Sequence, residues 1–160
     1  MRSRSLVWWV GGSLVLLHFV LHLGLGIGSA APDLLTVALL LLAREAGIGV
    51  AAGMGLAFGL LEDALSVVAF GANAVAMTVV GLAGGATRDL FVGDSIFFLV
   101  SYFVLGKVTR DLLHWVLMGD GFRSAVTPEA VVAGLLGGVY AAAVGVLVMA
   151  LVGLWREAPR

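Results

Sequence analysis

Long apolar runs without charge constrain this chain more than any other feature. Residues 6–27 and residues 130–155 contain no Asp, Glu, Lys or Arg. About 20 consecutive apolar residues are enough for one helix to span the hydrocarbon core of a bilayer. Charged residues make up 12% of the chain, roughly half their share in a soluble domain, and the mean hydropathy is +1.12. We therefore predict an integral membrane protein that crosses the bilayer several times.

Turn and charge signals divide the chain into six apolar segments. Pro32 breaks the first helix and Asp33 is suited to cap the second, and Pro128 suits the first turn of the last. The first run is longer than the apolar core of a signal peptide, which favours a spanning helix. The expected fold is all-α, one transmembrane domain with six short helices in a bundle. The predicted helices cover residues 6–27, 34–43, 48–61, 72–86, 95–117 and 130–155, the second and third being alternatively a re-entrant hairpin.

The distribution of arginine predicts the orientation. With the N-terminus inside, the positions on the inner side hold six arginines and the outer loops hold only Arg123. Cytoplasmic loops are enriched in Lys and Arg, so both termini are expected in the cytoplasm. The six inner residues are Arg2, Arg4, Arg44, Arg88, Arg156 and Arg160.

Glycine is abundant, with 23 residues, and recurs in the third, fourth and sixth segments. Small residues allow helices to approach closely in lipid, where the hydrophobic effect no longer drives their association. These stretches are predicted to be the internal contact surfaces of the bundle.

A cluster of ionisable residues interrupts the fifth segment. Lys107, Arg110, Asp111 and His114 are spaced i, i+3, i+4, i+7 and share one helix face,. Such residues inside a membrane usually face the protein interior. Three interpretations are open: an early, solvated helix end, a structural ion-pair network, or a pathway for a substrate or ion. The acidic pair that ends the third segment lies on the same side, so we expect Glu62 or Asp63 to pair with Lys107 or Arg110.

Three further polar residues have weaker signals. His18 and His22 lie one helical turn apart, but two ligands alone are a weak indication of a metal site. We interpret them as polar packing residues or as residues that face a partner helix. Asn73 is interpreted as a cap or an interhelical hydrogen-bonding residue. No cysteine and no catalytic motif occurs,, so we expect no enzyme, no metal, no cofactor and no nucleic-acid partner.

Three short stretches, in order, resemble the MreD family of bacterial rod-shape proteins. They read Pro-Asp-Leu-Leu from residue 32, Gly-Leu-Leu-Glu-Asp-Ala-Leu-Ser from residue 59, and Gly-Ala-Asn-Ala from residue 71. The resemblance covers residues 32 to about 88 and departs from the family in having Arg88 as the lone basic residue after the fourth segment. The motif residues are Pro32, Asp33, Gly59, Asp63, Ser66, Gly71 and Asn73.

The resemblance implies a non-enzymatic scaffold for cell elongation in the bacterial cytoplasmic (inner) membrane. Members of this family bind MreC, a bitopic membrane protein, and are linked through it to MreB, RodA and a class B penicillin-binding protein. The lipid bilayer surrounds such a subunit, and a homo-oligomer is possible. The family is similar in fold to the S-components of energy-coupling-factor transporters. The alternative function is therefore a substrate-binding S-component of a vitamin or micronutrient transporter.

Overall fold

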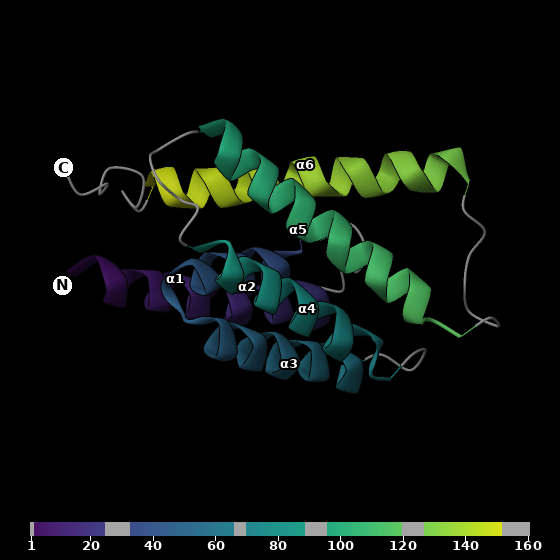
Figure 1. The fold of residues 1–160 in the computed structure, drawn as a ribbon, viewed down its shortest axis with the longest axis horizontal. Coiled ribbons are helices and arrows are strands. Elements are labelled where there is room, and N and C mark those ends of the chain that lie inside the picture. The colour runs from purple at the N-terminus through teal and green to yellow at the C-terminus, as the bar shows by residue number, and fades with distance from the viewer. Residues whose placement is uncertain (1, 25–32, 66–69, 89–95, 120–126, 152–160) are drawn as a thin grey trace.

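The chain folds into α-helices. The computed structural model describes residues 2–24, 33–65, 70–88, 96–119 and 127–151, and within these ranges there is no strand. The predicted all-α fold is confirmed (Figure 1). The elements are α1 (Arg2–Phe19) with the π-helical turn η1 (Val20–Gly24), α2 (Leu34–Glu45), α3 (Ile48–Leu65), α4 (Ala72–Ala86), α5 (Ile96–Leu117) and α6 (Pro128–Leu151).

Within the described residues, three helical stretches are long and apolar enough to cross a membrane, namely Ser5–Leu23, Ile48–Leu65 and Val131–Leu151. The chain is therefore a polytopic membrane protein. The second predicted crossing differs from these, because α2 has 12 residues and a length of only about 18 Å, whereas the hydrocarbon core is about 30 Å thick. Of the two segments considered for a re-entrant hairpin, α3 is thus long enough to cross and α2 is not.

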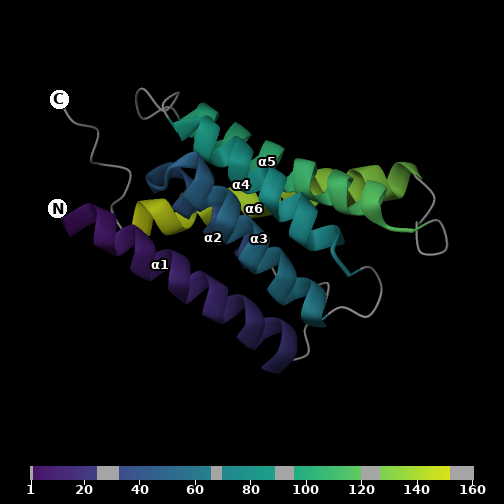
Figure 2. The same ribbon diagram turned by 60° about the horizontal axis from the view of Figure 1, so that its bottom comes forward.

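The centre of the bundle is α2. All ten residues from Leu34 to Ala43 are buried, because α2 is in contact with α1, α3, α4, α5 and α6. Figure 2 shows α1 at one edge of the bundle and α5 at the opposite edge, with α2 between them. A helix that is apolar all round belongs inside a structure rather than at its surface. Residues 34–43 of α2 are apolar apart from Thr36, which explains the central place of this helix.

Glycines bring α3 and α4 into close contact. A Cβ atom at Gly55 or Gly59 would collide with the backbone of α4, and one at Gly81 or Gly85 would collide with α3. The predicted small-residue contact surface is confirmed for this helix pair. It is wrong for Gly49 and Gly53 of α3 and for Gly134 and Gly137 at the start of α6, where a Cβ would meet no atom within 4 Å, whereas a Cβ at Gly138 of α6 would touch Val104 and Val108 of α5.

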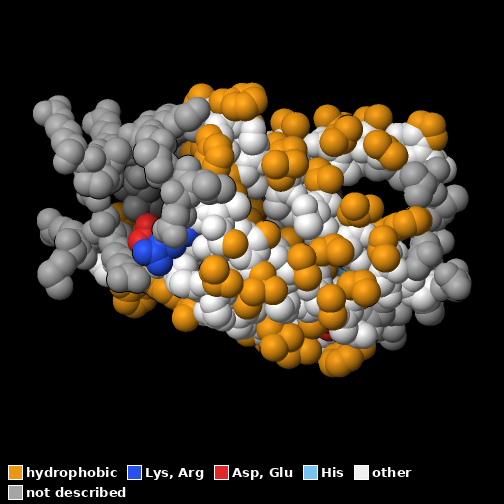
Figure 3. All heavy atoms as spheres, viewed as in Figure 1, with side chains coloured by type: hydrophobic (Ala, Val, Ile, Leu, Met, Phe, Trp, Pro, Cys, Tyr) orange, Lys and Arg blue, Asp and Glu red, His pale blue; other side chains and the backbone are white. Residues whose placement is uncertain are grey.

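Apolar side chains also cover the outside of the bundle. They are spread along the length of the face in Figure 3, and the exposed large hydrophobic residues belong to α1, α3, α4, α5 and α6. The first turn of α1 and the last turn of α6 lie at the same end of the bundle (Figure 1). We refer to the opposite end as the distal end.

The α3–α4 contact yields a test with an internal control. Gly81→Ala places a Cβ against the carbonyl oxygen of Ala51, whereas Gly53→Ala places one in open space on the same helix pair. Both substitutions replace glycine by alanine within a helix and so gain the same helix propensity. The difference between the free energies of unfolding of the two variants therefore measures the cost of the collision. We expect Gly81→Ala to lower the free energy of unfolding by about 1–3 kcal/mol relative to Gly53→Ala, measured by unfolding the purified protein in mixed micelles. Equal stabilities would contradict this packing.

Candidate functional site

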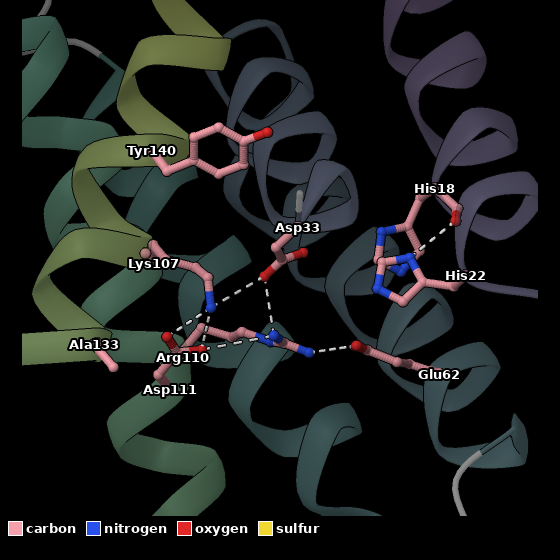
Figure 4. A pocket seen from close by; sticks show the side chains of 11 residues that line it. His18, His22, Asp33, Glu62, Lys107, Arg110, Asp111, Ala133 and Tyr140 are labelled. Carbon is pink, nitrogen blue, oxygen red and sulfur yellow. Dashed lines mark hydrogen bonds and ion pairs between the residues drawn. The ribbon is translucent and has the colours of Figure 1, made fainter. Parts of the chain in front are cut away.

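Charged side chains from several helices converge on one cavity at the distal end. The end of α1, the start of α2, the end of α3, the second half of α5 and the first half of α6 form its walls (Figure 4). The cavity has a volume of about 410 Å³. Its lining residues are His18, His22, Asp33, Glu62, Lys107, Arg110, Asp111, Ala133, Gly134, Gly137 and Tyr140.

Arg110 is the centre of the charged network. Its Nη1 donates to Oδ2 of Asp33 at 2.9 Å, and its Nη2 donates to Oε1 of Glu62 at 2.5 Å. The same Nη2 donates to Oδ1 of Asn73 at 3.0 Å. A planar guanidinium can serve several acceptors at once in fixed directions. One side chain of α5 thereby holds α2, α3 and α4 together.

Asp33 has two structural roles. Its Oδ1 accepts a hydrogen bond from the backbone N–H of Thr36 at 3.0 Å, and its Oδ2 accepts one from the Thr36 hydroxyl at 2.7 Å. The predicted capping of the second helix is confirmed, and it satisfies one of the free N–H groups at the helix start. The same carboxylate also lies 3.4 Å from the Lys107 ammonium, so the cap of α2 is part of the ion-pair network.

Lys107 and Asp111 form a pair along α5. The Lys107 ammonium donates to Oδ2 of Asp111 at 2.6 Å, one helical turn away. The exposed fractions of the Lys107 and Arg110 side chains are only 12% and 11%. These two cations are therefore mostly buried, and the cluster forms an ion-pair network between helices in which Asp111 stays 34% exposed. His114, on the same helix, is not among the residues that line the cavity.

Asp63 acts separately from the ion pairs. Its side chain is 1% exposed and accepts three backbone hydrogen bonds, from the N–H groups of Gly71, Asn73 and Ala74 at 2.9, 3.1 and 2.9 Å. The carboxylate of one helix thus caps the start of the next. Gly71 has φ +97°, a left-handed conformation that glycine adopts without steric cost.

The expected pairing between the third and fifth segments is therefore resolved. Glu62 pairs with Arg110, as predicted, whereas Asp63 is used as a cap. Both acids lie within α3, which extends past the predicted end at residue 61 to Leu65. Asn73 makes the predicted interhelical hydrogen bond.

The two histidines form a stacked pair beside the cavity. Their ring centroids are 4.0 Å apart with an interplanar angle of 27°, and Nδ1 of His22 lies 3.0 Å from the carbonyl oxygen of His18. His18 is only 3% exposed, so the expectation that it is exposed toward a partner is wrong. Its Nδ1 is buried and has no hydrogen-bond partner among the residues that the structure describes. Within the described ranges, no group of three or more His, Asp or Glu could hold a metal ion.

Sequence reasoning missed the contribution of α6 to this site. Tyr140 and the small residues Ala133, Gly134 and Gly137 form one wall of the cavity. Their spacing of three or four residues places them on one helix face, but the same spacing also suits a helix contact. Two motif residues, Pro32 and Ser66, lie outside the described residues.

No family model matches this chain, and no curated protein or solved structure matches it. The fold and the site define it by class, as an all-helical polytopic membrane protein with a buried ion-pair network next to a polar cavity.

Arg110 is predicted to be the most sensitive position of the network. Arg110→Gln leaves the Asp33 and Glu62 carboxylates without their guanidinium partner, and losing one member of a buried ion pair costs about 3–5 kcal/mol. Thermal unfolding in detergent should show a large loss of stability. Arg88→Gln, which removes an exposed arginine, is the control and should change little. A stable Arg110→Gln protein would contradict the network.

Asp63 is predicted to have a local effect on α4. Asp63→Asn replaces an acceptor-only group by an amide with one oxygen, so at least one of the three N–H groups loses its partner. We expect the free energy of unfolding to fall by about 1–2 kcal/mol. Hydrogen exchange at the Asn73 and Ala74 amides should become faster than in the unmodified protein, with a smaller change in the middle of α4. Unchanged exchange at these amides would exclude the capping role.

Proposed function

We propose that this chain is a non-enzymatic scaffold subunit of the bacterial cell-elongation machinery, of the MreD type. In this proposal it lies in the cytoplasmic membrane with both termini in the cytoplasm. It binds an MreC-like bitopic protein and is connected through it to MreB, RodA and a class B penicillin-binding protein.

One observation carries the proposal: the three stretches that resemble the family meet in space. The motif residues Asp33 of the first stretch and Asn73 of the third both bind Arg110, and so does Glu62, which precedes the motif residue Asp63 in the second stretch. Asp63 of the second stretch also caps the helix that the third stretch begins. Stretches that are separate in sequence thus build one structural unit. Because all three stretches take part in one structural unit, together they support a shared architecture with the MreD family more strongly than each short stretch does alone.

The position of α1 supports a role in binding a partner helix. Apart from the turn η1 that continues it, α1 is in contact only with α2 among the described helices, and its outer surface presents Trp9, Leu16 and Leu17, followed by Leu23 of η1. A bitopic partner contributes a single transmembrane helix, which needs an apolar face of this kind. The first turn of α1 and the last turn of α6 lie at the same end of the bundle (Figure 1). This arrangement agrees with the proposal that both termini are on the same side of the membrane.

Co-expression with the MreC-like protein of the same genome tests the scaffold role. The chain has no cysteine, so Leu17→Cys on α1 gives a single site for cross-linking to a cysteine in the partner's transmembrane helix. Val79→Cys, on the exposed side of α4, is the matched control. We expect co-purification, a cross-link at α1 several-fold stronger than at α4, and loss of this chain when the partner is deleted. Independent accumulation without co-purification would contradict the proposal.

The cavity favours a second candidate, the substrate-binding subunit of a transporter. A space of about 410 Å³ with convergent polar side chains is of the size used for small-molecule binding. A small molecule that remains bound through purification of the chain without any partner would support this candidate over the scaffold.

A further inference from the structure

We propose that the distal cavity binds a primary ammonium group, carried by the ethanolamine headgroup of a lipid or by a free small amine. The inference rests on the cavity alone and holds whether the chain is a scaffold or a transport subunit.

The charge of the cavity favours a cation. Three carboxylates, Asp33, Glu62 and Asp111, line it together with two cationic side chains, Lys107 and Arg110. Among the Asp, Glu, Lys and Arg side chains of the lining, the carboxylates therefore outnumber the cationic groups by one. A bound ammonium would neutralise this excess in a setting where an unpaired charge is costly.

The accessible charges of the lining are acidic. The Glu62 and Asp111 side chains are 23% and 34% exposed, about two to three times the exposed fractions of Arg110 and Lys107. The only side-chain donor to Glu62 in the described residues is Arg110, and a carboxylate accepts about four hydrogen bonds. A ligand that enters the cavity therefore meets carboxylate oxygens with free acceptor capacity before it meets the cations.

A buried ring nitrogen with no hydrogen-bond partner among the described residues lies on the opposite wall. His18 lines the cavity from α1, and its Nδ1 is buried without a hydrogen bond to any described residue. In a neutral imidazole one ring nitrogen donates and the other accepts, so the tautomer with its proton on Nε2 presents Nδ1 as an acceptor for an N–H donor. Figure 4 shows the His18 and His22 rings across the cavity from Lys107 and Asp111. An ammonium has three N–H bonds, enough to reach acceptors on more than one wall.

The small residues of α6 supply the space. A Cβ at Gly134 or Gly137 would meet no atom within 4 Å, so this wall is open next to Asp111. The described parts of α1 and α6, which face each other across the cavity, are not in contact. At about 30 Å³ for each water, a volume of about 410 Å³ accommodates a headgroup of several heavy atoms.

Lipid retention on the purified full-length chain tests the proposal. The protein is placed in nanodiscs with equal amounts of phosphatidylethanolamine and phosphatidylcholine, extracted with mild detergent and weighed by native mass spectrometry. Phosphatidylcholine has a quaternary nitrogen without N–H donors, so it controls for charge alone. We expect phosphatidylethanolamine to be retained about tenfold more, as one charged hydrogen bond implies.

Two variants with controls connect retention to the cavity. Asp111→Asn removes the most exposed carboxylate of the lining and should reduce the preference for phosphatidylethanolamine over phosphatidylcholine. Its control is Glu129→Gln, which changes an acid at the start of α6 that does not line the cavity and should leave this preference unchanged. Gly134→Leu fills the cavity without changing its charge and should also abolish the preference, whereas Gly53→Leu should not. Gly134→Leu keeps the test decisive if Asp111→Asn fails to fold.

Competition identifies the source of the ammonium. If free ethanolamine at millimolar concentration displaces the lipid or binds the lipid-free protein, the ligand is a small amine. If the lipid is retained against it, the ligand is the lipid headgroup. Equal retention of both lipids with no ethanolamine binding would overturn the proposal, and so would an equal effect of each variant and its control. Neither result depends on a protein partner, so the scaffold proposal fails or succeeds separately.

Discussion

The guanidinium of Arg110 determines how the helices of this bundle are arranged. A charge inside a membrane protein is tolerated only with partners, and Arg110 finds them on α2, α3 and α4. Because each partner belongs to a different helix, moving any of these helices leaves a buried charge or acceptor without its partner. The ion pairs therefore define the relative positions of four helices at the distal end.

The centre of the bundle is held by a different interaction. The short helix α2 is apolar on all sides and is surrounded by the other helices, while glycines bring α3 and α4 close together. Close packing at α3–α4 contrasts with the start of α6, where glycines face open space. Small residues thus have opposite consequences in the two places, a helix contact in one and a cavity wall in the other.

Several features of the site could be predicted, because they depend on spacing along one helix or on the chemistry of one residue. The common face of Lys107, Arg110 and Asp111 follows from their spacing, and Asp33 was expected to cap α2. The pairing of Glu62 with Arg110 was one of four possible pairs, since depth along a helix restricts the choice without deciding it. The burial of His18 could not be predicted, because an apolar face can contact either lipid or protein.

By itself, the sequence determined that this chain is helical, that it enters the membrane and where its main turns fall. These properties follow from local hydrophobicity, helix caps and breakers, which act within a few residues. The tertiary structure alone decided that Asp63 caps α4, that Arg110 binds one residue on each of three other helices and that a polar cavity opens beside them. Such contacts join residues on different helices, and the distance between two helices is set by the packing of the whole bundle.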